Sequence, residues 1–358
     1  MKIIFTNSIF YLQKKGGISR YYINLSRELS KLRIKHKIIA PFSKNYYLKN
    51  LKDNNFSFYI KKFPINFIFK KINYILFKYF LKKENPDIIH ETYYNSDNLN
   101  ILKGKINVVT VYDLVHEKFS KFYQKEKKFE KQKILNSADH FICISKKTQY
   151  DFVKYYKISP KKTSVIYLGC DHFKKNRIKN HNLNLPKNFF LYVGSRDGYK
   201  NFELLVKAIK ILNIDPMIKV VCFGGGKFSN LELDRYKLKD NFINIQGGDK
   251  LLSFLYSKAF ALINTSKYEG FGITNIEAMQ LGCPVISSDF RTLKEIGANS
   301  CLFFKNNNYV DLAKKLKIFI FKEKIRKKFI QKGYLRSKNF TWASCAKKTK
   351  KLYEDLAK

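Results

Sequence analysis

The sequence predicts an α/β protein made of two doubly wound domains, each with a parallel sheet at its centre. Short apolar runs of strand length alternate along the chain with longer segments whose apolar residues recur at helical spacing. The chain has 358 residues, which is enough for two domains that each bury a core of their own. Hydrophobic residues make up 45% of the chain and aromatic residues 16%, which indicates a folded protein rather than a disordered one.

The first predicted strand, residues 2–6, precedes a loop that holds Gly16 and Gly17 and then a segment of helical spacing, residues 18–29. A glycine pair between a strand and a helix suits a phosphate, because the free amides of the helix start point at the loop. A tight turn requires glycine just as often, so both interpretations stay open. Further short apolar runs predict the other strands of this domain, at residues 37–41, 56–60, 87–91, 106–111, 140–145 and 164–171.

Residues 63–83 interleave apolar and aromatic side chains with five lysines. Aromatic and basic residues interleaved in this way suit an amphipathic helix at an anionic lipid surface. The alternative is a core-facing helix with a solvated basic side, which we favour from the sequence.

Two of the predicted strands end in polar side chains. His90 closes one of them, and Tyr112, Asp113 and His116 follow another. Open α/β sheets bind ligands at the carboxyl ends of their strands, so we expect these side chains near a ligand. A single histidine is more often a structural polar group than a ligand contact.

Residues 173–187 are basic, rich in asparagine and without apolar periodicity, which is typical of a linker. We therefore expect a first domain at residues 1–176, a linker at 177–187, a second domain at 188–338 and a terminal helix at 339–358. The second sheet opens with a strand at residues 189–194, and the loop after it carries Arg196 and Lys200. A guanidinium and an ammonium on a turn at a helix start suit a diphosphate.

The stretch of residues 266–289 predicts a loop, a helix and a strand, and a short strand precedes it. Gly270 and Gly272 let the backbone of the loop approach a ligand closely. Thr274 is the predicted helix cap, and Gly282 the predicted stop. Glu277 lies three residues after Thr274, so a capping box is the structural interpretation of that carboxylate.

Glu269 and Glu277 are separated by seven residues, with Gly-Phe-Gly directly after the first and Ala-Met after the second. This run resembles the signature of family 4 retaining glycosyltransferases of the GT-B fold, the group 1 glycosyltransferases that include mannosyltransferases. In that family the first Glu contacts the donor sugar, the second contacts the ribose, and the loop contacts the sugar and the diphosphate. The resemblance assigns these roles to Glu269, to Glu277 and to the loop residues Gly270, Phe271, Gly272, Ile273 and Thr274.

The resemblance covers nearly the whole chain. Gly16 and Gly17 match the amino-terminal loop that closes over the donor phosphates and the acceptor, and Arg196 and Lys200 match the loop that holds the donor diphosphate. The family's His-Asp-Leu reads Tyr112-Asp-Leu here, so the histidine that orders the donor sugar is replaced while Asp113 is retained. The expected catalytic residues are Glu269 and Asp113, and the expected acceptor-side residues are His90, Tyr112 and His116.

The resemblance implies two Rossmann-like domains that face a central cleft. A GDP- or UDP-linked sugar would bind mainly to the second domain, and a glycan or lipid-linked acceptor to the first. The sequence lacks an Asp-x-Asp motif, so we expect no metal, with Arg196 and Lys200 stabilising the charge of the leaving diphosphate. No cofactor is expected. Retention without an obvious carboxylate nucleophile implies attack from the face that the diphosphate leaves. A nucleotide-sugar hydrolase or epimerase is the alternative enzyme.

The net charge of +42 raises a basic nucleic-acid-binding protein as an alternative from another class. Lysine is dispersed over the whole length, which is more typical of AT-rich codon usage than of a binding patch, so no specific nucleic acid is expected. Six cysteines stand singly, without metal-ligand spacing, as expected for reduced thiols. No apolar stretch approaches the roughly 20 residues of a membrane span. We expect a cytoplasmic protein, with a peripheral position on the inner face of a membrane if residues 63–83 dock there.

Overall fold

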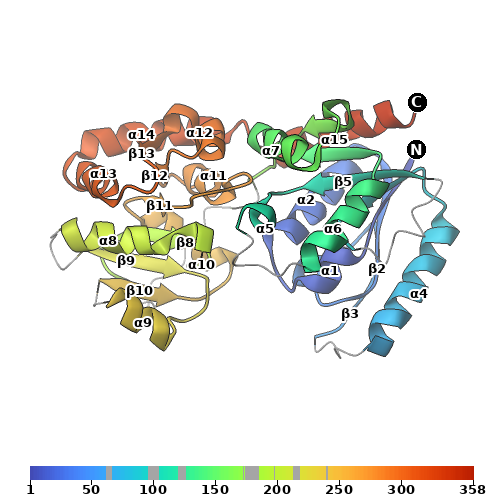
Figure 1. Cartoon of the computed structure of the whole chain (residues 1–358), viewed down its shortest axis with the longest axis horizontal. Coiled ribbons are helices and arrows are strands. Elements are labelled where there is room, and N and C mark those ends of the chain that lie inside the picture. Colours follow the sequence, from blue (N-terminus) through green and yellow to red (C-terminus); the bar gives the residue numbers. More distant parts are fainter. Residues whose placement is uncertain are drawn as a thin grey trace. The chain divides into compact units, whose positions relative to one another are not determined.

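The computed structural model describes residues 1–61, 67–95, 105–119, 126–171, 173, 185–196, 198–212, 218–238 and 241–358. Contacts divide the chain into two compact units. Unit 1 comprises Met1–Gly169 and Trp342–Lys358, and unit 2 comprises Cys170–Thr341 (Figure 1). The boundaries predicted from the sequence lie at residues 176 and 338, and residues 177–184 of the predicted linker lie outside the described part of the chain.

The described residues of unit 1 form a seven-stranded parallel sheet in the order β3-β2-β1-β4-β5-β6-β7. The chain builds outward from β1 through β2 to β3 and then continues on the other side of β1 with β4, so the order reverses between β1 and β4. Such a switch point leaves a crevice at the carboxyl ends of the two strands. The strands are β1 (Lys2–Phe5), β2 (Lys35–Ser43), β3 (Asn55–Tyr59), β4 (Ile88–Glu91), β5 (Ile106–Val111), β6 (His140–Cys143) and β7 (Thr163–Val165).

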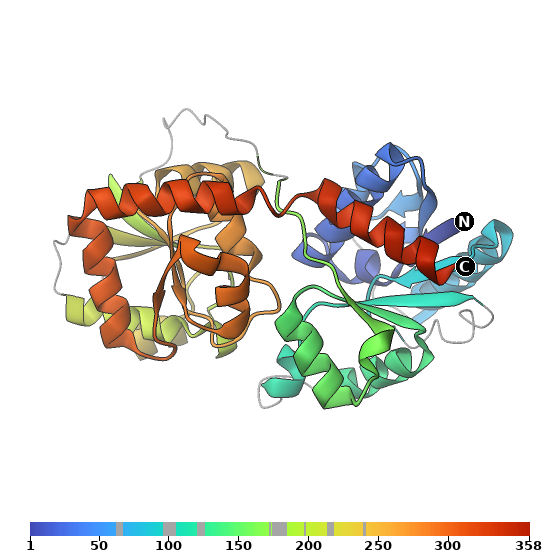
Figure 2. The same ribbon diagram turned by 90° about the horizontal axis from the view of Figure 1, so that it is seen from above.

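The helices of unit 1 include one from the far end of the sequence. α15 packs along α2 (Figure 2), and its first residue, Trp342, approaches so closely that a Cβ on Gly169 would lie 2.3 Å from the Trp342 backbone nitrogen. Trp342 also contacts Tyr21, with ring centroids 6.0 Å apart. The helices are α1 (Ser8–Leu12), α2 (Gly17–Lys31), α3 (Tyr46–Lys49), α4 (Phe67–Glu84), α5 (Val115–Lys118), α6 (Glu126–Ser137), α7 (Lys146–Tyr156) and α15 (Trp342–Leu356).

Unit 2 repeats the architecture with six described parallel strands in the order β10-β9-β8-β11-β12-β13. The order reverses between β8 and β11. The strands are β8 (Asn188–Val193), β9 (Ile218–Phe223), β10 (Phe242–Ile245), β11 (Leu262–Asn264), β12 (Val285–Ser288) and β13 (Cys301–Phe304). The helices are α8 (Phe202–Leu212), α9 (Asn230–Tyr236), α10 (Asp249–Lys258), α11 (Ile273–Gln280), α12 (Arg291–Gly297), α13 (Tyr309–Phe321) and α14 (Glu323–Ser337). The predicted class, α/β with two parallel sheets, is confirmed.

Helical periodicity explains how the layers of unit 2 pack. Phe202, Leu205 and Ile209 recur at three- and four-residue spacing on α8 and join the core that includes Phe190 and Ile263 of the sheet. Apolar side chains at this spacing share one face of a helix, and burying each contributes roughly 1.5 to 3 kcal/mol. The lysines of α8 occupy the opposite, exposed face.

α4 is built differently from α8. Asn73, Phe77 and Leu81 are buried against the sheet, so the core-facing interpretation of this segment holds for one side of the helix. The opposite side is not simply basic, because it also exposes a row of large apolar side chains. Residues 63–66 of the predicted segment lie outside the described residues.

Candidate functional site

At the switch point of unit 2, the loops that follow β8 and β11 are bonded to each other. Thr265 Oγ1 donates a hydrogen bond of 2.8 Å to the carbonyl oxygen of Lys200. The amide of Lys267 donates another, also of 2.8 Å, to the carbonyl of Tyr199. These bonds fix the loop that carries Lys200 against the loop that carries Glu269.

Lys200 and Glu269 form an ion pair at this point. Lys200 Nζ lies 2.7 Å from Glu269 Oε1, and Ser266 Oγ donates to the same carboxylate oxygen over 2.7 Å. The two side chains keep 19% and 13% of their surface exposed, so a ligand can reach them. The structure therefore brings together two predicted site residues, although the sequence did not predict that they pair.

The glycine loop after Glu269 has the backbone that the sequence predicts. Gly272 has φ of +81°, a left-handed conformation that favours glycine, and directly precedes α11. A Cβ at this position would also lie 2.5 Å from Leu293 Cδ2. Phe271 turns its ring inward onto Phe340, at a centroid distance of 5.6 Å, so the loop offers a ligand its backbone there. The backbone N–H groups of the first turn of α11 point out of the helix at this loop, as a site for an anion requires.

The predicted cap of α11 is wrong. The helix begins at Ile273, with Gly272 in the cap position, so Thr274 lies inside the first turn and caps nothing. The capping-box interpretation of Glu277 fails with it. Glu277 is buried instead, and Tyr256 Oη of α10 donates to its Oε2 over 3.2 Å. The ribose contact of Glu277 stays a prediction.

A buried network of polar side chains, which the sequence did not predict, supports the loop that carries Glu269. Asn264 Nδ2 donates to Asn275 Oδ1 over 3.0 Å, and Asn264 Oδ1 accepts from the amide of Ser266. Asn275 Nδ2 donates to Ser287 Oγ over 3.2 Å, and Ser288 Oγ donates to the carbonyl of Ser266 over 2.7 Å. These bonds join β11, α11 and β12 beneath Glu269. The short polar side chains at the ends of the apolar strands are the feature of the sequence from which this network could have been predicted.

Arg196 lies on the same loop as Lys200 but points elsewhere. Its Nε and Nη2 donate to the two carboxylate oxygens of Glu232 on α9, at 2.5 and 3.0 Å. The two Nη atoms also donate to the carbonyls of the turn at Gly224, Gly225, Gly226 and Lys227. The three glycines of this turn have φ between +69° and +84°. Every guanidinium nitrogen thus has a partner in the described residues, and the diphosphate contact of Arg196 stays a prediction.

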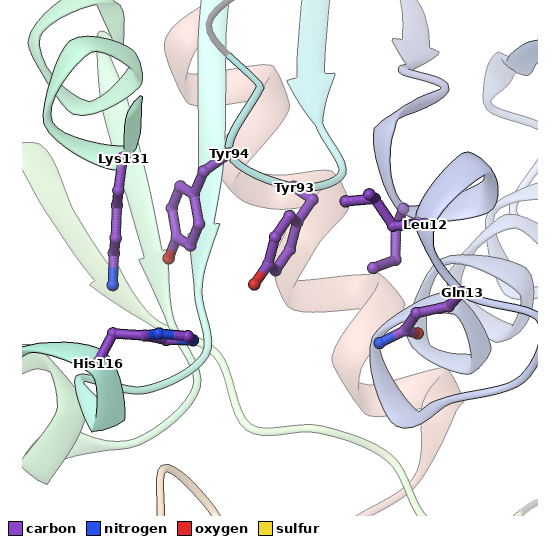
Figure 3. Close-up of a pocket in the computed structure, with 7 residues that line it drawn as sticks. Leu12, Gln13, Tyr93, Tyr94, His116 and Lys131 are labelled. Carbon is purple, nitrogen blue, oxygen red and sulfur yellow. The ribbon is translucent and has the colours of Figure 1, made fainter. Parts of the chain in front are cut away.

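Unit 1 contains a pocket of about 360 Å³. Ile9, Leu12 and Gln13 line one side, after β1, and Tyr93 and Tyr94 line the other, after β4, with His116 and Lys131 at one end (Figure 3). The pocket thus lies at the switch point between β1 and β4. Of these residues the sequence singled out His116 alone. Tyr93 and Tyr94, which directly follow a strand, are the feature of the sequence from which the rest of this pocket could have been predicted.

Charges beside this pocket are largely paired. Lys131 Nζ lies 2.8 Å from Glu117 Oε1 and 4.7 Å from the ring centroid of Tyr94. Burial raises the pKa of Glu117, but the charge and hydrogen bond of Lys131 outweigh burial and hold that pKa below its ordinary value. Burial, with Asp113 and Glu117 nearby, raises the pKa of Tyr93 to about 12. The Tyr93 hydroxyl is therefore neutral at pH 7 and can both donate and accept a hydrogen bond.

Asp113 is half-buried near the same pocket residues. Its Oδ1 accepts from the amide of Val115 over 3.0 Å at the start of α5, and its carbonyl accepts from Lys131 Nζ over 3.3 Å. The carboxylate thus helps to shape the turn that presents His116. Its expected catalytic role stays a prediction.

The expected acceptor-side contacts of His90 and Tyr112 stay predictions, and both side chains are buried inside unit 1. His90 Nδ1 lies 2.5 Å from Tyr353 Oη of α15, and its Nε2 lies 2.8 Å from Thr110 Oγ1. Burial lowers the pKa of His90 to about 3, so the ring is neutral. Tyr112 packs edge-on against Tyr21, with ring centroids 6.1 Å apart. His90 thus anchors the terminal helix.

Gly16 and Gly17 lie at the start of α2. Gly16 has φ of 175°, extended backbone that any residue adopts, and Gly17 is the first helical residue, with open space where a Cβ would lie. Neither glycine is required by the turn itself. Their predicted contact with donor phosphates stays a prediction.

The described residues contain neither a metal-ligand cluster nor a membrane-spanning helix. No group of three His, Cys, Asp or Glu side chains there is placed to hold a metal ion. No helix there combines the length and the low polarity that crossing a membrane requires. The six cysteines are buried free thiols, as predicted.

Two family profiles match the chain. Residues 173–336 match the glycosyl transferases group 1, and residues 15–173 match glycosyltransferase family 4. An uncharacterized glycosyltransferase of Methanocaldococcus jannaschii is 30% identical over 100% of this chain and 99% of its own length. The O-antigen chain mannosyltransferase RfbU of Salmonella typhimurium is 32% identical over 46% of each chain.

A third relative and a solved structure match almost the full length. An α-1,4-N-acetyl-D-galactosaminyltransferase of Campylobacter jejuni, whose name specifies a diphospho-undecaprenol-linked substrate, is 25% identical over 95% of this chain and 94% of its own. The crystal structure of Anabaena HepE with UDP and glucose superimposes with a TM-score of 0.76 at 16% identity, covering 99% of this chain and 100% of that one. This likeness shows that the fold is GT-B, as the resemblance implied.

Proposed function

The chain belongs to the group 1 glycosyltransferases, and from that premise we propose that it transfers a sugar from a nucleotide-sugar donor to a glycan or lipid-linked acceptor. We propose further that transfer retains the anomeric configuration and requires no metal ion. Its place would be the synthesis of a surface polysaccharide or glycoconjugate, as the names of the O-antigen and undecaprenol-linked relatives suggest. We place the protein in the cytoplasm, peripheral on the inner face of a membrane.

The observation that carries this proposal is the Lys200–Glu269 ion pair at the switch point of unit 2. The pair combines a cation for the diphosphate with a carboxylate for sugar hydroxyls, 2.7 Å apart, beside the amides at the start of α11. A nucleotide sugar carries these two chemical groups next to each other. When a donor binds, Lys200 would turn from Glu269 to a phosphate oxygen, and Glu269 would exchange the ammonium for donor hydroxyl groups.

The residues of unit 2 also supply what the leaving group needs. Negative charge develops on the diphosphate as its bond to the sugar breaks, and preorganised cations and amides stabilise such charge strongly. Lys200 and the amides of Gly272, Ile273 and Thr274 would do this without a metal. The acceptor hydroxyl would attack from the same face and give its proton to the departing phosphate. A uridine or guanosine diphosphate donor fits this chemistry, and the UDP named for HepE supports uridine.

The acceptor would bind in the pocket of unit 1. Tyr93 and Tyr94 offer aromatic faces, and Leu12 offers an apolar one, as sugar rings prefer (Figure 3). The neutral Tyr93 hydroxyl, His116 and Gln13 can bond acceptor hydroxyl groups. Because Lys131 is paired with Glu117, this end of the pocket favours an uncharged sugar over an acidic one.

The proposal is tested by the products that form from UDP- and GDP-linked hexoses with and without a lipid-linked glycan acceptor. We expect acceptor-dependent transfer with an α-linked product by nuclear magnetic resonance, unchanged by excess chelator. A release of free sugar that does not depend on acceptor would indicate a hydrolase, and an isomerised donor would indicate an epimerase. Complete, metal-reversible inhibition by chelator would overturn the metal-free mechanism.

A further inference from the structure

The outward side of α4 carries a ridge of large apolar side chains, which we call the α4 ridge. Its members are Ile68, Ile72, Ile75 and Tyr79, whose side chains are 64%, 40%, 54% and 60% exposed, respectively. They recur at spacings of four, three and four residues, so they form one stripe along the helix. The opposite side of α4 already packs on β2, and Figure 1 shows the helix at the margin of unit 1. The ridge is therefore extra apolar surface that the core of unit 1 does not use.

Phe58 of β3 extends this surface. Its side chain is exposed, and its ring packs on Phe42 at a centroid distance of 6.4 Å, while Phe42 packs on Phe69 of α4 at 4.8 Å. Phe58 thus belongs to the same face of the unit as α4. Monomeric soluble proteins rarely expose contiguous apolar patches of this kind without a binding role.

A second stripe, of lysines, runs beside the ridge. Lys71, Lys78 and Lys82 are exposed and recur at spacings of seven and four residues, so they line one flank of Ile68, Ile75 and Tyr79. No Asp or Glu occurs between residues 67 and 83, and no described acidic residue forms an ion pair with these three lysines. Glu84 ends the helix, and it is paired with Lys2 and Lys37 at 2.6 Å each.

We propose that the α4 ridge and its lysine stripe dock the protein on an anionic lipid bilayer. The isoleucines and Tyr79 would enter the boundary between headgroups and acyl chains, while the lysines reach lipid phosphates with their flexible stems along the helix. The apolar stripe matches the acyl chains of an anionic bilayer, and the cationic stripe beside it matches the lipid phosphates. Docking would bring the protein to a lipid-linked acceptor, and in that respect the inference rests on the proposed function. Docking itself requires neither the donor nor the acceptor.

Other occupants fit the surface less well. In a symmetric dimer of this chain through the ridge, the same patch faces itself, so lysine stripes of like charge would lie close together. Nucleic acid would use the lysines but leave the isoleucines and Tyr79 in water. An anionic bilayer uses both stripes.

The first test is sedimentation of the full chain with vesicles of phosphatidylcholine and phosphatidylglycerol in equal amounts. The variant Ile72→Gln with Ile75→Gln removes half of the ridge at exposed positions. Since burying each isoleucine is equivalent to about tenfold in partitioning, we expect vesicle binding to fall about a hundredfold. The matched control, Ile211→Gln with Leu231→Gln, removes two exposed apolar side chains from unit 2 and should bind as the unchanged protein does.

The second arm concerns charge. Lys71→Ala with Lys78→Ala should weaken binding by roughly tenfold or more, because each cation near an anionic surface is equivalent to about fivefold in affinity. The control Lys314→Ala with Lys317→Ala makes the same change of net charge on α13 and should have little effect. Vesicles of phosphatidylcholine alone should bind the unchanged protein much less.

Several outcomes would overturn the proposal. Equal binding by the ridge variant and the unchanged protein, both with unaltered melting temperature, would show that the ridge does not meet lipid. Equal losses for the two lysine pairs would indicate attraction by the overall charge of the protein. A dimer in sedimentation velocity that the ridge variant dissociates, without change in vesicle binding, would assign the ridge to a second copy. We expect the ridge variant to bind uridine diphosphate as the unchanged protein does. This result would show that the variant has lost docking and not the proposed donor site.

Discussion

Arg196 and Lys200 stand four residues apart on one loop of unit 2, yet they meet very different surroundings. Arg196 is 4% exposed, pairs with Glu232 and donates to four consecutive carbonyls of the turn at residues 224–227. Lys200 pairs with Glu269 where a ligand can reach both. The sequence presents two equivalent cations, whereas in the structure Arg196 is buried with a full set of partners and Lys200 stays partly exposed in a single ion pair.

The difference follows from the shapes of the two side chains. A guanidinium has five N–H donors in a planar fork, so it can bond a carboxylate and several carbonyls at once. An ammonium is a compact charge on a flexible stem, and it exchanges partners more easily. The comparison therefore predicts that changes at the Lys200–Glu269 pair alter function, while changes at the Arg196–Glu232 pair alter the glycine turn and stability.

The largest effect is expected for Glu269→Gln. The amide keeps the size of the side chain but loses the charge that faces Lys200 and donor hydroxyls, so transition-state stabilisation should fall by roughly 2 to 4 kcal/mol. Steady-state kinetics would show this as a loss of about thirtyfold to a thousandfold in kcat/KM. The control Glu203→Gln changes an exposed carboxylate of the same unit, and it should keep full activity. Near wild-type turnover of Glu269→Gln would remove Glu269 from the site.

Arg196→Ala should act mainly on stability. It removes the hydrogen bonds of Arg196 to Glu232 and to the four turn carbonyls, which should lower the free energy of unfolding by about 2 kcal/mol. Ser229 still donates to Glu232, and Gln246 still donates to the carbonyls of Gly224 and Gly226. Urea denaturation measures this change, and the exposed Arg235→Ala is the control. Calorimetry should show uridine and uridine diphosphate weakened alike. A selective loss for the diphosphate would instead assign Arg196 to the phosphates, as the family resemblance implied.

Lys200→Ala should weaken binding of the nucleoside diphosphate and leave the free nucleoside almost unchanged. Charge-assisted hydrogen bonds contribute roughly 1.5 to 3 kcal/mol, or about tenfold to a hundredfold in affinity. Calorimetric titration with uridine and uridine diphosphate decides this, with Lys207→Ala as the control at an exposed pair. If neither ligand loses affinity, the phosphate site lies elsewhere, and Gly16 and Gly17 are the next place to look.

The smallest effect concerns pH. The hydrogen bond from Arg196 holds the pKa of Glu232 below its ordinary value of 4.5, although burial opposes the shift. A carboxylate with a depressed folded-state pKa stabilises the protein above its unfolded-state pKa, and this contribution disappears as pH falls through the folded-state value. Glu232→Gln should therefore flatten the decline of melting temperature below about pH 4.5. Parallel declines in the variant and the unchanged protein would contradict the pairing.

The sequence by itself determined the fold class and the loop at the centre of the proposed donor site. Alternating apolar runs define strands and helices locally, so the two parallel sheets could be predicted from periodicity alone. The loop from Glu269 to Gly272 could also be predicted, because glycine where a strand gives way to a helix is a local requirement of the backbone. The family resemblance added roles that neither periodicity nor spacing contains.

Tertiary structure decided which polar groups are available, because burial and pairing depend on residues far apart in the chain. Arg196 is occupied by Glu232, 36 residues away, and His90 is occupied by Tyr353, 263 residues away. The cap position of α11 is taken by Gly272 and not by Thr274, because the φ there is left-handed and a Cβ would clash with Leu293. On α4, periodicity alone could not tell which apolar side would face the sheet, since both sides are apolar. Only packing against β2 left Ile68, Ile72 and Ile75 in solvent.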